Sequence, residues 1–138
     1  MTTPIDANLL LRHFTGDPPD QAARATAFIR QAAPRELLLF DLQVAECVYV
    51  LAGPYRQSRA DVVRLLRSAM EVPAIEFERG PVINRALHLY LQQATDFPDG
   101  YLVAMTENLG LTHVVGFERF DAKLVRASSV RRIEPPPS

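Results

Sequence analysis

Hydrophobic and polar positions follow two different patterns along this chain, and each pattern predicts a different element. Short apolar runs, such as ELLLF at residues 36–40 and THVVGF at residues 112–117, have the length of buried strands. Longer stretches with apolar residues every three or four positions, such as RADVVRLLRSAMEV at residues 59–72, predict amphipathic helices. Because the two kinds of segment alternate, we expect an α/β fold with a mostly parallel central sheet and helices on both faces.

The pattern also places the individual elements. Strands are expected at residues 3–6, 36–40, 74–78, 112–117 and 130–135. Helices are expected at residues 7–14, 21–33, 42–53, 59–72 and 80–94, and from residue 97 onward. The side chains predicted to cap helix N-termini are those of Asp20, Asp41, Ser58 and Asp96. We expect one domain over residues 1–134 and a disordered tail at residues 135–138.

Composition narrows the class of protein. Of the 138 residues, 48% are hydrophobic and 22% are charged, as in ordinary soluble globular proteins. The single cysteine, Cys47, excludes an internal disulfide and a cysteine-based zinc site. No apolar run approaches the ~20 residues of a membrane span, and the first residues lack a basic segment typical of a signal peptide. A cytoplasmic location is therefore expected.

Charge alone does not indicate nucleic acid, because the formal net charge is −1. The type of basic residue is more informative, since fourteen of the fifteen basic residues are arginine and Lys123 is the only lysine. Arginine makes forked contacts to phosphate. A GC-rich genome would also favour arginine. The arginine content therefore does not distinguish phosphate binding from genome composition.

Glu46 is the acid that the pattern explains least well. It lies within QVAECVYVLA, between Val44 and Val48, where the expected helix is apolar. A carboxylate is rarely buried without a partner, because its desolvation is very costly. A salt bridge to an arginine or a partly exposed helix face would account for Glu46. The other explanation is a bound divalent cation.

Further acids lie where a parallel sheet would bring ligands. Asp6 ends the first expected strand, and Glu118 follows the run THVVGF. Asp96 and Asp99 lie three residues apart at the start of a helix, so both can face the same way while Asp96 caps it. Ligands of such sheets bind beyond the carboxyl ends of the strands. Several carboxylates at one place need a cation, and their hard oxygen atoms suit Mg²⁺ or Mn²⁺.

A family resemblance follows from four segments. These are IDANLLLRHF at the N-terminus, the apolar segment that holds Glu46, DFPDGYLVAMTENLG, and VVGFERFDAKL with the later VRRIEP. In this order they resemble a PIN domain, and more narrowly a VapC-type toxin ribonuclease of bacterial type II toxin–antitoxin pairs. The resemblance covers nearly the whole chain and implies a three-layer α/β fold.

The resemblance also implies a function and a set of site residues. It implies an endoribonuclease that cleaves RNA with Mg²⁺ or Mn²⁺, a cognate antitoxin as partner, and a homodimer. Asp6, Glu46 and Asp99 match the catalytic and metal-binding acids, and Glu118 stands at the fourth acid. The supporting residues would be Asn8, Asp96 and Asp121, and RNA would be held by Arg12, Arg119 and Lys123. The family pattern at the fourth acid is T/S-F-D, whereas this chain has Gly116-Phe117-Glu118.

Two other functions stay open. The altered Gly116-Phe117-Glu118 segment could leave a PIN-like domain that binds a partner or RNA without cleavage. An acidic pocket could also belong to a phosphatase of the haloacid-dehalogenase type or to a receiver domain. The phosphatase is disfavoured because Asn8, not an acid, stands two residues after Asp6. The receiver is disfavoured because no acidic pair lies near the N-terminus.

Overall fold

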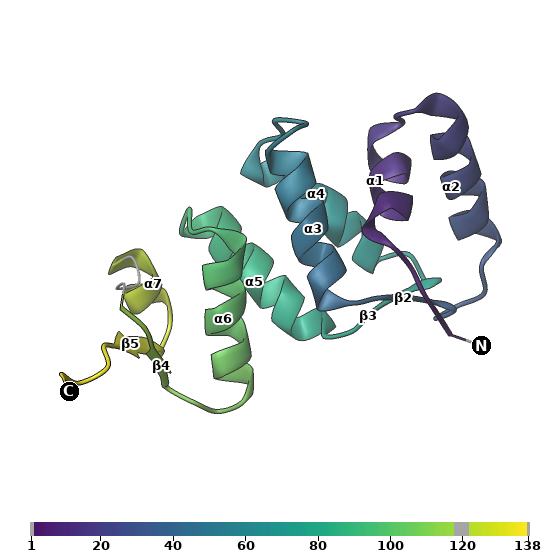
Figure 1. Ribbon diagram of the computed structural model, residues 1–138. Helices are drawn as coiled ribbons and strands as arrows, with labels where there is room; N and C mark the ends of the chain where they lie inside the picture. The colour runs from purple at the N-terminus through teal and green to yellow at the C-terminus, as the bar shows by residue number, and fades with distance from the viewer. Residues whose placement is uncertain (1, 118–121, 138) are drawn as a thin grey trace. The chain divides into compact units, whose positions relative to one another are not determined.

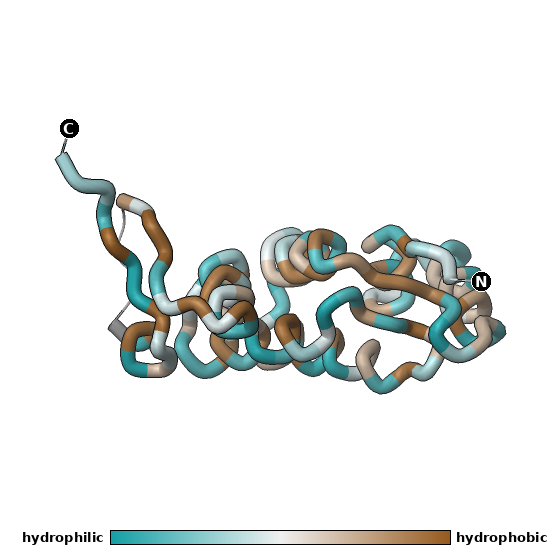
Figure 2. The backbone as a smooth tube through the Cα atoms, turned by 90° about the horizontal axis from the view of Figure 1, so that it is seen from below, coloured by the Kyte–Doolittle hydropathy of each residue, from teal (hydrophilic) through white to brown (hydrophobic). Residues whose placement is uncertain are grey.

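The fold is α/β, as the hydrophobic pattern predicted. The computed structural model describes residues 2–117 and 122–137. The chain divides into two compact units, Met1–Gly80 and Pro81–Ser138. Figure 1 labels their elements, and Figure 2 shows hydrophobic and hydrophilic residues alternating along them. Every strand pair that the described residues form is parallel.

The first unit is built on a three-stranded parallel sheet. The strands β1 (Thr3–Pro4), β2 (Leu37–Leu39) and β3 (Ile75–Phe77) lie in the order β1-β2-β3. Thr3 pairs with Leu37, and Leu37 pairs with Ile75. The helices α1 (Ala7–Thr15) and α2 (Pro19–Gln31) connect β1 to β2, and α3 (Asp41–Ala52) and α4 (Arg59–Met70) connect β2 to β3. Parallel neighbours need such crossovers.

The core of this unit follows from the two periodicities. Leu37 and Leu39 are fully buried because alternate residues of a strand face the same side. The helices supply further fully buried side chains, among them Leu10, Val44, Leu51, Val62 and Leu66. These apolar faces hold α1 and α3 against one another at the ends of the strands they follow.

The second unit contains three helices and a smaller sheet within its described residues. Its elements are α5 (Gly80–Gln92), α6 (Phe97–Asn108), β4 (His113–Val115), α7 (Ala122–Ala127) and β5 (Arg131–Ile133). The strands β4 and β5 are parallel, with Val114 opposite Arg132. Four buried side chains, Leu89, Val103, Leu124 and Val130, form one hydrophobic cluster of this unit.

Two of the four predicted helix caps are confirmed. Ser58 accepts a hydrogen bond from the backbone N–H of Asp61, and Asp96 accepts one from that of Asp99. The other two predictions are wrong: the N-cap positions are Pro18 for α2 and Phe40 for α3. Pro19 suits the first helical position because its missing N–H would have no partner there, so α2 begins before Asp20. The short helix α7 was not predicted.

Among the helices that the structure describes, none combines the length and the apolar character needed to cross a membrane.

Candidate metal and RNA site

Asp6 stands where β1 ends and α1 begins. It is the N-cap of α1, and its Oδ1 accepts a hydrogen bond of 2.8 Å from the backbone N–H of Asn8. The carboxylate is exposed, so the cap leaves it open to solvent. This bond comes from the main chain of Asn8 and not from its side chain.

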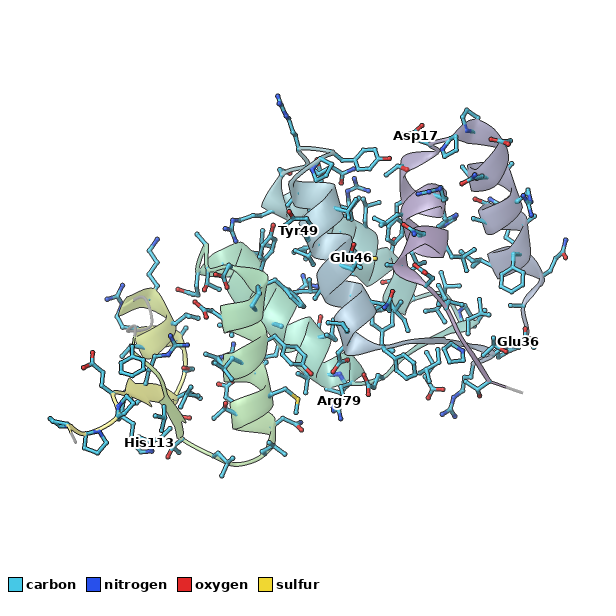
Figure 3. All side chains as sticks on the ribbon, in the orientation of Figure 1. Asp17, Glu36, Glu46, Tyr49, Arg79 and His113 are labelled. Carbon is cyan, nitrogen blue, oxygen red and sulfur yellow. The ribbon has the colours of Figure 1, made fainter. Side chains whose placement is uncertain are left out.

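Glu46 is exposed, which corrects the argument from burial. On α3 it shares one helical face with Leu42 and Tyr49, whose exposed fractions are 78% and 72%. The opposite face carries Val44 and Leu51, which are fully buried. Figure 3 shows Glu46 and Tyr49 on α3. The exposed-face explanation is thus the correct one, and Glu46 needs no cation to offset a desolvation cost.

Asp6 and Glu46 nevertheless lie near the same point in the first unit. The backbone N–H of Ala7 donates to Gln43 Oε1 at 2.8 Å, and Cys47 Sγ lies 4.0 Å from the carbonyl oxygen of Ala7. These contacts join the start of α1 to the middle of α3. Burial, and to a lesser extent repulsion from the Glu46 and Asp6 carboxylates, raises the pKa of the Cys47 thiol to about 12. Two predicted metal ligands therefore flank one buried thiol.

The acids of the second unit lie at the start of α6. Asp96 is exposed and caps the helix, whereas Asp99 is half-buried in the first turn. The Oδ1 atom of Asp99 lies 3.7 Å from Nη2 of Arg132 on β5. The cap residue Asp96 and the predicted ligand Asp99 therefore lie close together at the start of α6, as the sequence predicted.

The donor set suits a hard divalent cation in type. Asp6, Glu46 and Asp99 offer carboxylate oxygens, which Mg²⁺ and Mn²⁺ prefer. Within neither unit do three or more described His, Cys, Asp or Glu side chains gather closely enough to hold a metal ion. The predicted ligands are divided between the units, with Asp6 and Glu46 in the first and Asp99 in the second. The predictions for Glu118, Arg119 and Asp121 lie outside the described residues.

A groove lies between α1 and α2 in the first unit. It encloses about 480 Å³ and is lined by Asn8, Leu9, Arg12, Gln21, Arg24, Ala25 and Phe28. Nε of Arg12 donates to Gln21 Oε1 at 2.8 Å, which fixes that predicted RNA-binding side chain along the groove. Phe28 is 51% exposed, whereas its neighbour Ile29 is buried. Its spacing from Gln21 and Arg24 could have shown that the three share one face of α2.

Lys123 is the other basic residue that was predicted to bind RNA and that the structure describes. Its side chain is exposed on α7, in the second unit. Arg12 thus belongs to the same unit as Asp6, and Lys123 to the same unit as Asp99.

A charged cluster that the sequence did not reveal lies after β2 and β3. Nη1 of Arg79, the residue labelled in Figure 3, lies 3.1 Å from Asp41 Oδ2 and 3.1 Å from Glu78 Oε2. Glu78 Oε1 also accepts a hydrogen bond from the Asp41 backbone N–H. Because Asp41 is buried and begins α3, these contacts fix the start of the helix that carries Glu46.

Comparison with known proteins adds one observation. No protein-family model matches the sequence. The chain is similar to a VapC ribonuclease. That protein, from Aquifex aeolicus (strain VF5), is 24% identical over 122 residues, which span 87% of this chain and 90% of the relative. The similarity thus extends over both units.

Proposed function

We propose that this protein is a metal-dependent endoribonuclease that cleaves RNA phosphodiester bonds. The observation that carries the proposal is that the start of α1, which Asp6 caps, contacts α3, the helix that carries Glu46, and that both carboxylates are exposed. The similarity to a VapC ribonuclease over most of the chain supports the same reaction. It also supports a VapC-type toxin ribonuclease as the more specific class.

In the proposed reaction, Asp6, Glu46 and Asp99 would hold one Mg²⁺ or Mn²⁺, with Glu118 as a fourth acid. Such an ion supplies an activated water and offsets charge on the attacked phosphate. The Asn8 N–H keeps the Asp6 carboxylate oriented by its 2.8 Å hydrogen bond. Gln43 accepts a hydrogen bond from the Ala7 N–H and so joins the start of α1, next to Asp6, to α3, the helix that carries Glu46.

The groove between α1 and α2 provides the proposed RNA contacts. Arg12 and Arg24 supply positive charge for phosphates, and the exposed Phe28 ring offers a face on which a base can stack. This combination of cations and an aromatic side chain is typical of single-stranded nucleic acid sites. Lys123 and Arg119 would add phosphate contacts from the second unit.

The proposed partners are a cognate antitoxin and a second copy of the chain. An antitoxin segment would cover exposed apolar helix faces and place a basic side chain at the acids. Co-expression with the product of the adjacent gene would then give a stable complex and relieve a growth defect. Absence of a growth defect when this protein is expressed alone would count against the toxin assignment.

Incubation of the purified protein with a panel of structured RNAs tests the activity itself. We expect cleavage with Mg²⁺ or Mn²⁺, none with a chelator, and none by Asp6→Asn prepared in the same way, which controls for contaminating nucleases. RNA binding without cleavage under all conditions would favour the alternative of a binding protein. Cleavage that persists in chelator would exclude the proposed chemistry.

A further inference from the structure

The lining of the groove between α1 and α2 is rich in hydrogen-bond donors. Its polar members are Asn8 and Arg12 on α1 and Gln21 and Arg24 on α2, and none of the described lining residues is acidic. An arginine side chain has only donors, and the amide group of asparagine or glutamine has two donor hydrogens. The groove therefore suits a negatively charged ligand that presents several acceptor oxygens.

Arg12 is held in place before any ligand arrives. It is half-buried, and its Nε donates to Gln21 Oε1 at 2.8 Å. No other hydrogen bond joins its guanidinium to a residue that the structure describes, so both Nη groups remain for a ligand. Because arginine cannot accept a hydrogen bond, the Gln21 atom at this contact is the carbonyl oxygen, and the amide NH₂ group remains a donor. Such preorganised donors lose little side-chain freedom when a ligand binds.

The groove also has an aromatic end. Phe28 is 51% exposed and shares one face of α2 with Gln21 and Arg24. Gln21 and Phe28 are seven residues apart, which corresponds to ~10 Å along the helix. Arg24 is exposed between them and forms no ion pair with another described residue. One nucleotide can therefore place its base on the Phe28 ring and a phosphate among the donors.

The number and charge of the donors favour one kind of phosphate. A phosphate inside an RNA strand is a diester with one negative charge and two unbridged oxygens. A phosphate at the end of a strand is a monoester with three such oxygens and a charge of about −1.5 to −2 at pH 7. Arg12, Gln21 and Arg24 supply three donor side chains, two of them charged. Charge-assisted hydrogen bonds of this kind are stronger for the more highly charged group.

We propose that the groove between α1 and α2 binds a terminal phosphate of single-stranded RNA, with the adjoining base stacked on Phe28. This inference rests on the proposed function, which places RNA in this groove, but it requires no metal ion. The protein would then favour RNA fragments that an earlier hydrolysis has left with a phosphate end. Both the 5′ and the 3′ end of a fragment can carry such a monoester, so the test includes both.

The test is the affinity of the full chain for three pentauridylates, measured by isothermal titration calorimetry with a chelator present. One carries a 5′-phosphate, one a 3′-phosphate and one no terminal phosphate. We expect one phosphorylated form to bind about tenfold more tightly than the unphosphorylated form, the usual effect of a hydrogen bond to a charged group. The form that shows this preference identifies the end of the strand that the groove holds.

Variants locate the preference in the groove. Arg12→Gln and Arg24→Gln should each remove most of it, and Gln21→Glu should remove it by adding a negative charge without changing the shape of the side chain. Phe28→Ala should weaken binding of all three ligands and leave their ratio unchanged, because stacking does not depend on the terminal phosphate. Arg30→Gln, on the opposite face of α2, is the charge-matched control and should keep the preference. Melting curves check that each variant is folded.

Equal affinity for the three pentauridylates would overturn the inference, although binding that Phe28→Ala weakens would still support RNA in the groove. A preference that persists in both Arg12→Gln and Arg24→Gln, or that Arg30→Gln removes equally well, would also overturn it, because the phosphate would then lie elsewhere. If no pentauridylate binds, both this inference and the RNA groove of the proposed function fail.

Discussion

At the scale of single residues, one acid performs two physical tasks. Asp6 caps α1 through its bond to the Asn8 N–H, and its exposed carboxylate is the first proposed metal ligand. An asparagine side chain caps a helix about as well as an aspartate, but it carries no charge. The two tasks can therefore be separated by two substitutions at one position.

Asp6→Asn should keep the stability of the protein and lose metal-dependent RNA cleavage. Asp6→Ala should lose the same activity and also about 1 kcal/mol of the free energy of unfolding, because the cap is lost. Urea unfolding and the cleavage assay measure the two effects. Retained cleavage in Asp6→Asn would remove Asp6 from the metal site, and equal stability of all three forms would show that the cap contributes nothing.

The exposure of Glu46 shows why its burial was wrongly inferred from the sequence. Its helix is apolar on most sides, with Leu42, Val48 and Tyr49 as well as the buried Val44. Helical spacing therefore could not tell which face turns to the core. The Ser58 and Asp96 caps were predictable because each acts on an N–H three residues away. The Asp41–Arg79 pair was not, because its members lie 38 residues apart.

At the scale of elements, the hairpin of α1 and α2 carries a pH-sensitive contact. Nδ1 of His13 lies 2.8 Å from Thr26 Oγ1 on α2. Burial, and to a lesser extent the nearby charge of Arg30, lowers the pKa of His13 below its ordinary value of 6.5. The folded state therefore prefers the neutral ring. This contribution to stability is complete above the ordinary pKa and declines as the pH falls below it.

We expect the melting temperature of the wild type to fall between about pH 7.5 and about pH 5.5, and to fall less in His13→Gln, which cannot be protonated there. The difference between the two proteins isolates His13 from the other groups that titrate in this range. An identical pH dependence in both would show that the His13 pKa is the same in the folded and unfolded chains.

The same hairpin also forms the proposed RNA groove. In an Asp6→Asn background that cannot cleave, Phe28→Ala should weaken binding of single-stranded RNA by about 1–3 kcal/mol, the usual effect of losing one stacked base. Arg24→Gln should reduce the salt dependence of binding, with a change in slope of about 0.7 for each lost phosphate contact. Arg30 lies on another face of α2, so Arg30→Gln is the matched control. Equal effects of Arg24→Gln and Arg30→Gln would show that the groove does not hold RNA.

At the scale of the whole molecule, the sequence predicted the fold class and most element positions, because both depend on local periodicity. The parallel pairing of β1, β2 and β3 agrees with the alternation of strands and helices. The candidate site was less predictable. Its acids come from distant segments, and their order gave only a resemblance to a family. The exposure of the groove residue Phe28 and the pairing of Arg132 with Asp99 depend on packing. The expectation of one domain over residues 1–134 stays a prediction.

The central claim is that the acids, and not merely the fold, perform metal-dependent RNA cleavage. The most direct measurement is the rate of Mn²⁺-dependent cleavage by Glu46→Gln, compared with that of Glu71→Gln, an exposed glutamate at the end of α4. Because Glu46 is exposed, its loss should leave the melting temperature nearly unchanged. We predict that Glu46→Gln loses cleavage while Glu71→Gln cleaves like the wild type. Wild-type cleavage by Glu46→Gln would contradict the proposed site.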